Sequence, residues 1–194
     1  MNTNTIKDFE ILDTIKNRRS IRAFSDQPVE GEKIKALFEA ARWAPSAMNE
    51  QPWQYIYATR EDERLYHLIG ETLMPGNRIW ALKAPLLIVS LARKTFLDNG
   101  SHNSSALHDT GMANYALSLQ ATEMGIYTHM MGGFDHNLLR KNMNVPEDLQ
   151  PVVVIAAGYP GDLKDLPENL RQREFSMRNR KKPGEFIFRK PLNS

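Results

Sequence analysis

Three arginines and a serine lie within five residues near the start of the chain, in the run Arg18-Arg19-Ser20-Ile21-Arg22. A phosphate monoester carries close to two negative charges, and arginine matches it with a fixed fork of N–H donors while serine adds a hydroxyl. A basic helix end in solvent, favoured by the helix dipole, has the same composition. The run by itself therefore fits either a phosphate clamp or a solvated helix terminus.

A proline-bounded loop rich in amides follows, in the run Pro45-Ser46-Ala47-Met48-Asn49-Glu50-Gln51-Pro52-Trp53. Asn49 and Gln51 each carry a donor and an acceptor on one side chain, which suits the alternating donors and acceptors at the polar edge of a flat heterocycle. Serine, asparagine and proline are also ordinary turn formers, so a plain loop is the alternative. Trp53 is expected to anchor the core at the start of a strand.

Hydrophobic periodicity predicts the elements that must position these two runs. A helix from about Lys7 to Asn17 precedes the arginines, and a second helix carrying Ile34 and Leu37 ends before Pro45, since the residue before a proline avoids the helical region. The other predicted elements are strands at Trp53–Thr59, Pro85–Leu91, Ile126–Met131 and Pro151–Tyr159, short helices at Glu61–Glu71, Asn77–Leu82 and Asp135–Asn142, a turn at Met74–Asn77 and a loop at Lys94–Ser105.

The longest predicted helix, Ser105–Met124, is rich in small and apolar residues around much of its circumference, as in a helix buried in a core or at a subunit interface. Gly125 fits its C-terminal cap. These elements favour an α+β fold around one mixed or antiparallel sheet, in a single domain over residues 1–194.

The chain becomes polar and basic after Pro160, with too few apolar residues to fold by itself. Residues 160–194 are therefore expected either to be disordered or to wrap another surface as an extended arm. Phe186, Ile187 and Phe188 favour an arm that wraps another surface, for example as a strand added to a partner's sheet.

Composition limits the classes of function. A net charge of +2 gives mixed surfaces and no nucleic-acid stripe, and the absence of cysteine excludes disulfides, thiolate nucleophiles and thiolate metal sites. The start, Met1 to Glu10, is polar, and no apolar run approaches the roughly 20 residues of a membrane span, so a cytoplasmic location is expected. No Gly-x-Gly-x-x-Gly follows a strand, and His102, His108 and Asp109 lack metal-ligand spacing, so no metal site is expected.

In this order the motifs resemble the nitroreductase family of flavin mononucleotide (FMN) enzymes, whose loop reads Pro-Ser-x-x-Asn-x-Gln-Pro-Trp. The resemblance implies a mostly antiparallel sheet flanked by helices and a homodimer with two FMN sites at the subunit interface, each C-terminal arm extending onto the partner. It assigns the FMN phosphate and ribityl chain to Arg18, Arg19 and Ser20, and the pyrimidine end to Arg22. The further FMN-binding positions that it implies are Pro45, Ser46, Ala47, Asn49, Gln51, Asn77, Gly132, Gly133, Arg180 and Lys181, with Arg178 as an alternative because the tail Arg178–Pro183 has one basic residue too many.

The implied reaction is ping-pong hydride transfer from NADH or NADPH to a nitroaromatic, quinone, flavin or enone. The flavin carries the chemistry, so no side chain is expected to be catalytic, and a cation at Arg22 would stabilise the negatively charged reduced flavin. Met74, Trp80, Phe96 and Phe134 are candidates for the acceptor side or for packing, and His129 for the border of the site. The alternatives are a specialised flavoenzyme that dehalogenates or fragments flavin, a flavin binder without turnover, and an interaction protein without flavin.

Overall fold

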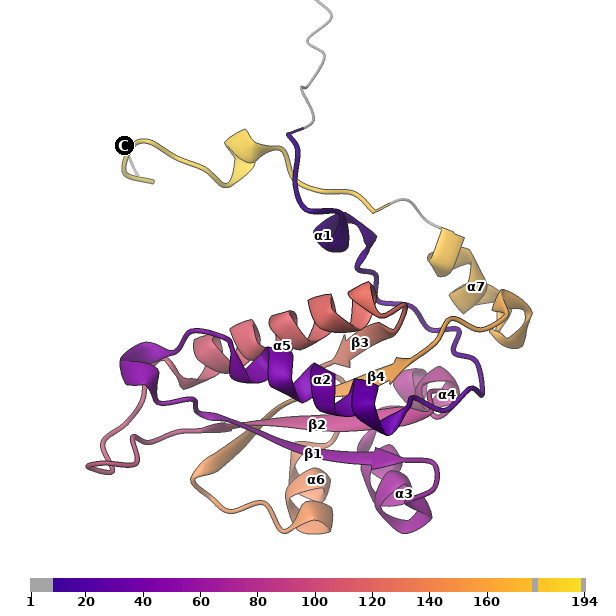
Figure 1. The fold of residues 1–194 in the computed structure, drawn as a ribbon, viewed down its shortest axis with the longest axis horizontal. Helices are drawn as coiled ribbons and strands as arrows, with labels where there is room; N and C mark the ends of the chain where they lie inside the picture. Colours follow the sequence, from indigo (N-terminus) through magenta and orange to yellow (C-terminus); the bar gives the residue numbers. More distant parts are fainter. Residues whose placement is uncertain (1–8, 176–177, 193–194) are drawn as a thin grey trace, which may run out of the picture.

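The computed structural model describes residues 9–175 and 178–192, where four strands form one antiparallel sheet (Figure 1). Their order across the sheet is β1-β2-β4-β3, and the predicted α+β class is confirmed. The predicted strand at Trp53–Thr59 has the predicted bounds, and the other three are shifted by one or two residues. The strands are β1 (Trp53–Thr59), β2 (Leu86–Arg93), β3 (Tyr127–Met131) and β4 (Leu149–Gly158).

The two central strands are apolar throughout because both faces of the sheet are covered. Leu86 and Ile88 of β2 point into one hydrophobic cluster, whereas Leu87 and Val89 point into another on the opposite face. All four side chains are fully buried, and each contributes about 1.5–3 kcal/mol by leaving water. This double burial confirms the interpretation of the Pro85–Leu91 run as a strand buried on both faces.

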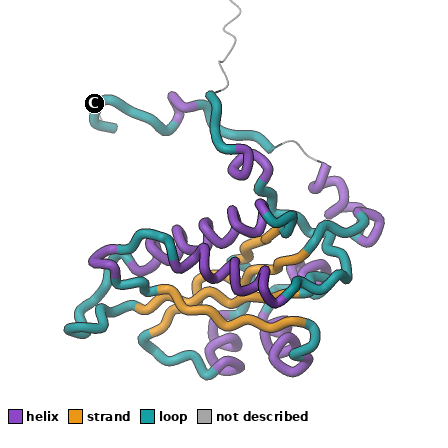
Figure 2. The backbone as a smooth tube through the Cα atoms, viewed as in Figure 1, coloured by secondary structure: helices purple, strands orange, loops and turns teal. Residues whose placement is uncertain are grey.

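Helices form a layer on each side of the sheet, as Figures 1 and 2 show. One layer consists of α2 and α5, which pack against each other, and the other contains α3 and α6. The two terminal helices α1 and α7 lie outside these layers, near one end of α5. The helices are α1 (Asp13–Asn17), α2 (Gly31–Arg42), α3 (Glu63–Thr72), α4 (Pro75–Ala81), α5 (Ala106–Glu123), α6 (His136–Met143) and α7 (Glu168–Phe175).

The cap predicted for the C-terminus of α5 is confirmed, and α6 is capped at its N-terminus. Gly125 has φ +72° just after α5, and the Ile126 amide donates to the Ala121 carbonyl, which closes the helix end. Asp135 accepts hydrogen bonds from two backbone amides in the first turn of α6. Helix α5 has 18 residues and is therefore about 27 Å long, and it contacts β1, β2 and β3 of the sheet.

Two local predictions differ from the structure. Helix α1 begins only at Asp13, because the apolar residues Phe9 and Leu12 are 76% and 71% exposed and have no core to bury against, while Lys7 and Asp8 lie outside the described residues. The predicted turn at Met74–Asn77 is instead the start of α4, where Pro75 opens the helix at a position that needs no N–H donor.

The C-terminal segment contains α7 and a short 3₁₀ helix at Pro183–Glu185 (Figure 2). Leu166 and Leu170 are buried in the core, whereas Phe186, Ile187 and Phe188 are at least 50% exposed and have no strand assignment. A wrapping arm therefore stays a prediction. Among the described residues, no helix combines the length and the apolar character that crossing a membrane requires.

Candidate functional site

A cationic cleft opens where α1, α5 and the C-terminal segment meet. It has a volume of about 560 Å³, and a smaller cleft of about 250 Å³ shares its arginines. The larger cleft is lined by Ile11, Ile15, Lys16, Arg18, Ser20, Tyr115, Ser118, Thr128, Met130, Arg178 and Arg180, and the smaller by Arg18, Arg19, Ser20, Arg22, Arg173, Glu174, Arg178 and Arg180.

The fold brings Arg18 and Ser20 together with arginines from the far end of the chain. Arg18 Nη1 donates to Ser20 Oγ at 3.2 Å, and Arg178 Nη1 donates to the Arg18 carbonyl at 2.6 Å. Burial, together with the guanidinium of Arg178, lowers the pKa of Arg18 from its usual value. Neighbouring cations held partly out of water repel each other, so a bound multivalent anion would relieve the repulsion. This placement favours an anion site over a solvated helix end.

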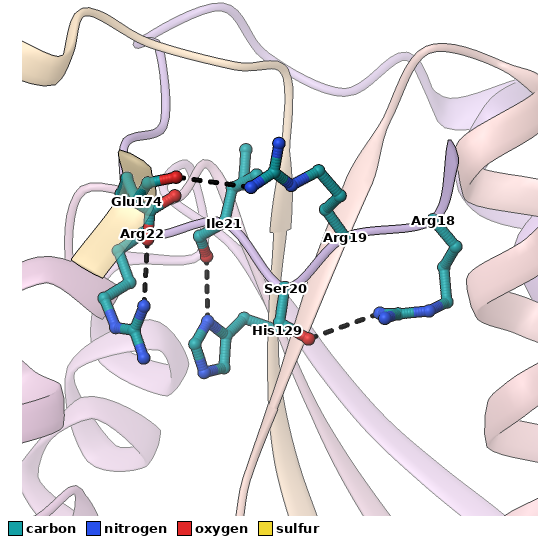
Figure 3. A network of polar contacts seen from close by, with 7 residues as sticks. All are labelled: Arg18, Arg19, Ser20, Ile21, Arg22, His129 and Glu174. Atoms are coloured by element: carbon teal, nitrogen blue, oxygen red, sulfur yellow. Dashed lines mark hydrogen bonds and ion pairs between the residues drawn. The ribbon is translucent and has the colours of Figure 1, made fainter. Parts of the chain in front are cut away.

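Arg22 is held from two sides, and Figure 3 shows its contact with Glu174. Its Nη1 donates to Glu174 Oε1 at 2.9 Å, and its guanidinium lies 5.8 Å from the centre of the Trp80 ring. On the neighbouring side, His129 packs against Trp80 with ring centroids 4.4 Å apart, and its Nδ1 lies 2.9 Å from the Ile21 carbonyl oxygen. The backbone of the arginine run and the Arg22 side chain are therefore fixed by the same group of residues.

His129 is neutral in this environment. Burial is the main cause that lowers its pKa to about 4, and the cations of Arg22 and Arg18 add to the effect. Since a carbonyl can only accept, we assign the ring proton to Nδ1, which donates to the Ile21 oxygen. His129 is not among the residues that line either cleft, and it acts as a neutral hydrogen-bond donor to the backbone of the arginine run.

Asn77 and Gly133 meet at the end of β3. Asn77 Nδ2 donates to the Gly133 carbonyl at 3.0 Å, and a Cβ on Gly133 would lie 2.8 Å from that nitrogen, so a larger residue at position 133 would have to displace the Asn77 amide. Gly132 has open space where its Cβ would be. Thr128 and Met130 of β3 both line the cleft, and Gly132 follows Met130 by two residues, or about 7 Å of extended backbone, so the lining of the cleft continues along β3 toward this pair.

The amide-rich loop lies elsewhere, at the N-terminal end of α5 (Figure 1). The Ala47 amide donates to Asp109 Oδ2 at 2.9 Å, and Asp109 is 2% exposed, so its role is to hold the loop on α5. Ser118 lines the cleft nine residues further along the same helix, which corresponds to about 13 Å. Within one chain, the loop Pro45–Gln51 and the cationic cleft are therefore separate.

The loop backbone is in an unusual conformation. Met48, Asn49 and Gln51 have φ of 54°, 55° and 51°, in the left-handed region that costs a residue with a side chain about 1–2 kcal/mol. Ser46 Oγ accepts from the Gln51 amide at 3.0 Å and helps to hold the turn. The Asn49 and Gln51 residues are exposed to solvent. Strain of this kind gathers at binding sites, where it fixes a geometry in advance.

The four candidates for the acceptor side divide into two buried side chains and two that are more exposed. Trp80 and Phe134 are 1% and 3% exposed and belong to the core, so the packing role is the one that the structure supports, whereas Met74 is 50% exposed and Phe96 is half-buried. Arg178 and Arg180 line both clefts, while Lys181 is exposed and is not among the lining residues.

Sequence reasoning missed Glu174. It is an acidic residue in a basic stretch, and no local spacing indicates that α7 brings it to Arg22. His108 pairs with Asp109, and in the part of the chain that the structure describes no three His, Asp or Glu side chains are placed to hold a metal ion.

Comparison with known proteins gives concordant matches. Residues 15–74 and 71–159 match the model of the Nitroreductase family. A Streptococcus pyogenes serotype M6 protein assigned as an NAD(P)H nitroreductase is 38% identical over 183 residues, covering 77% of this chain and 90% of that protein. A Bacillus subtilis strain 168 protein named FMN reductase (NAD(P)H) is 25% identical over 170 residues, covering 79% of this chain and 67% of its own length. A crystal structure of an oxidoreductase containing FMN superimposes with a TM-score of 0.90 at 28% identity, covering 99% of this chain and 98% of that one.

Proposed function

This chain belongs to the nitroreductase family, and from that premise we propose that it is an FMN-dependent oxidoreductase that transfers hydride from NADH or NADPH to a small flat acceptor. The observation that carries the proposal is the cationic cleft, in which Arg18 and Ser20 meet Arg178 and Arg180. These groups come from opposite ends of the sequence, and a shared anion explains why they gather in one place.

The donors in the cleft suit the phosphate of FMN. Arg18, Arg178 and Arg180 offer guanidinium forks, and Ser20 offers a hydroxyl, without a carboxylate among these four. Burial, together with repulsion from Arg178, lowers the pKa of Arg18, and a phosphate dianion would offset both effects. We assign the phosphate end of the cofactor to these residues.

The ring end of the cofactor would lie toward Gly132 and Gly133. Glycine lets the backbone approach a flat ring closely, and Asn77 beside Gly133 offers an amide to its edge. Arg22, between the two ends, places a cation beside the position where negative charge gathers on reduction. Bound FMN supplies the hydride chemistry, and the protein supplies orientation and electrostatics, so no side chain acts as nucleophile or base.

The loop Pro45–Gln51 would complete this site from a second copy of the chain. Within one chain the loop lies at the opposite end of α5, and its strained backbone exposes Asn49 and Gln51. The outer face of α5 carries exposed Leu107 and Tyr115, and Gly111 has open space that allows a second helix to approach. With the two-fold axis perpendicular to α5, an isologous contact along this helix would set the two copies antiparallel and bring the loop of one subunit to the cleft of the other.

In this homodimer we propose that residues 160–194 form the arm of a single domain and extend onto the partner. Phe175, Phe186 and Ile187 are 71%, 58% and 59% exposed, and apolar groups of this size favour a covered position. The arm would then supply Arg178 and Arg180 to the flavin site while it stabilises the dimer.

The decisive experiment is the visible absorbance of the purified protein before and after anaerobic addition of NADH or NADPH. We expect flavin bands that bleach with at least one donor and return when a quinone or nitroaromatic is added. Initial rates at several fixed acceptor concentrations should give parallel double-reciprocal lines, as a ping-pong reaction requires. Flavin bands that do not bleach would contradict the reductase, and a protein that takes up no added FMN would contradict the flavin site itself.

A further inference from the structure

The smaller cleft contains one carboxylate among its lining residues. Arginine side chains and Ser20 make up the rest of the lining, and Glu174 is the exception. Its side chain is 9% exposed, and its Oε1 lies 2.9 Å from Arg22 Nη1. A carboxylate in a cleft that otherwise attracts anions weakens the attraction for a negatively charged ligand. The presence of Glu174 in this cleft therefore needs a separate explanation.

The contact between Glu174 and Arg22 is anchored on both sides. The Glu174 carbonyl accepts a hydrogen bond from Arg19 Nη2 at 3.2 Å, so α7 is tied to the arginine run by its backbone as well as by its carboxylate (Figure 3). The Arg22 side chain is 23% exposed and lies over Trp80. A pair held in this way is less screened by solvent than an ion pair between mobile surface side chains.

The charge on Arg22 matters more for the reduced cofactor than for the oxidised one. Reduction adds negative charge to the pyrimidine end of the ring, and a lone cation there would stabilise the reduced form and raise its potential. When Glu174 is paired with Arg22, the two charges act as a dipole, whose field on the ring is weaker than that of the free cation. Reduced cofactor is then a stronger reductant toward the acceptor.

We propose that Glu174 is a positioning residue that holds Arg22 and partly neutralises it, and thereby lowers the reduction potential of FMN bound beside it. This inference rests on the proposed function. If Glu174 only competed with the ligand, it would weaken the binding of oxidised and reduced FMN equally. The proposed role instead changes the ratio of the two affinities.

The test compares the full-length variants Glu174→Gln and Glu168→Gln by the midpoint potential of bound FMN and by the dissociation constants of oxidised and reduced FMN. Glu174→Gln removes the charge but keeps the shape. Glu168 lies on the same helix, pairs with Arg171 and does not line either cleft, so its variant is a matched control for charge.

We expect Glu174→Gln to bind reduced FMN about tenfold more tightly relative to oxidised FMN, which raises a two-electron potential by about 30 mV. Glu168→Gln should keep the potential of the unmodified protein, and Glu174→Asp, which retains the charge, should stay closer to it than Glu174→Gln does. Glu174→Ala serves as a second neutral variant should the glutamine protein fold poorly.

An unchanged potential in the neutral variants, or an equal gain in affinity for both redox states, would overturn the role of Glu174. Failure of the proposed function is distinguishable, because then the unmodified protein itself would take up no FMN or would not be reduced by NADH or NADPH. A potential that rises in Glu168→Gln as much as in Glu174→Gln would also overturn it, since the effect would then belong to net charge and not to the contact with Arg22.

Discussion

The cationic cleft and the amide loop are built by opposite means. The cleft joins Arg18 and Ser20 to Arg178 and Arg180, so it exists only when the two ends of the chain meet. The loop is held by short-range contacts, such as the bond from the Gln51 amide to Ser46, and by one link to α5 through Asp109. The cleft should therefore respond to charge, salt and loss of the tail, whereas the loop should respond to local backbone changes.

The largest effect is expected from truncation after Lys164. The change removes Arg178 and Arg180 from the cleft and Leu166 and Leu170 from the core, so FMN affinity should fall by more than about 100-fold and the dimer should weaken. Isothermal titration with FMN and analytical ultracentrifugation measure the two effects.

A second truncation after Arg180 separates the two roles of the tail. It keeps α7 and the arginines but removes Phe186–Phe188, so FMN affinity should be largely retained while dimerisation weakens. A yellow, fully dimeric protein truncated after Lys164 would show that neither role belongs to this segment.

Arg18→Ala should give the next largest loss. Charge-assisted hydrogen bonds contribute about 1.5–3 kcal/mol each, so FMN affinity should fall by about 10–100-fold, and the salt dependence of binding should become shallower. The matched control is Arg42→Ala, an exposed arginine paired with Glu39 away from the cleft, which should leave both quantities unchanged. Equal losses in the two variants would mean that net charge, and not the cleft, attracts the ligand.

Asp109→Ala tests the loop without changing the cleft. The part-buried Ala47 amide would lose its acceptor, which should lower the free energy of unfolding by about 1–3 kcal/mol in urea denaturation. The salt dependence of FMN binding should stay as it is. Asp13→Ala, on an aspartate that is 88% exposed, should change stability by less than about 0.5 kcal/mol. If the salt dependence of FMN binding changes in Asp109→Ala, the conformation of the loop and the charges of the cleft are coupled, contrary to this expectation.

The sequence predicts most of the sheet and both motifs, because these depend on local patterns. The run Trp53–Thr59 is aromatic and β-branched, and β2 is apolar over its whole length, so neighbouring residues suffice to identify them. Contacts between distant segments carry no such local signal. The bond from Arg178 to the Arg18 carbonyl and the pair of Glu174 with Arg22 join residues more than 150 positions apart, and only the folded chain reveals them.

The start of α1 illustrates the same limit from the other side. Phe9 and Leu12 have the spacing of an apolar helix face, but both side chains are exposed. The spacing alone therefore does not extend the helix to these residues. Periodicity predicts a face, and the tertiary structure decides whether that face is used.

A pH titration tests the environment of His129, which is bonded to the backbone of the arginine run. Its folded pKa is about 4 and its unfolded value about 6.5, so the unfolded chain binds the extra proton between these values and stability is lost as pH falls. Between about pH 7.5 and pH 5 the loss should be about 2 kcal/mol of unfolding free energy, and His129→Gln should lack it. Urea denaturation at both pH values measures the difference, and an identical pH dependence in the two proteins would contradict a neutral buried His129.

The smallest effect is expected in the loop backbone, at Met48. Its φ of 54° costs a residue with a Cβ about 1–2 kcal/mol, which glycine avoids, although glycine also loses about 0.5–1 kcal/mol through the freedom of the unfolded chain. Met48→Gly should therefore change stability by no more than about 1 kcal/mol, whereas Met48→Val, branched at Cβ, should destabilise by about 1–2 kcal/mol. Because Met48 is 88% exposed, lost packing contributes little to either change. If valine proves as stable as glycine, the loop relaxes at no cost, and its geometry is then fixed by Asp109 and Ser46 and not by a strained backbone.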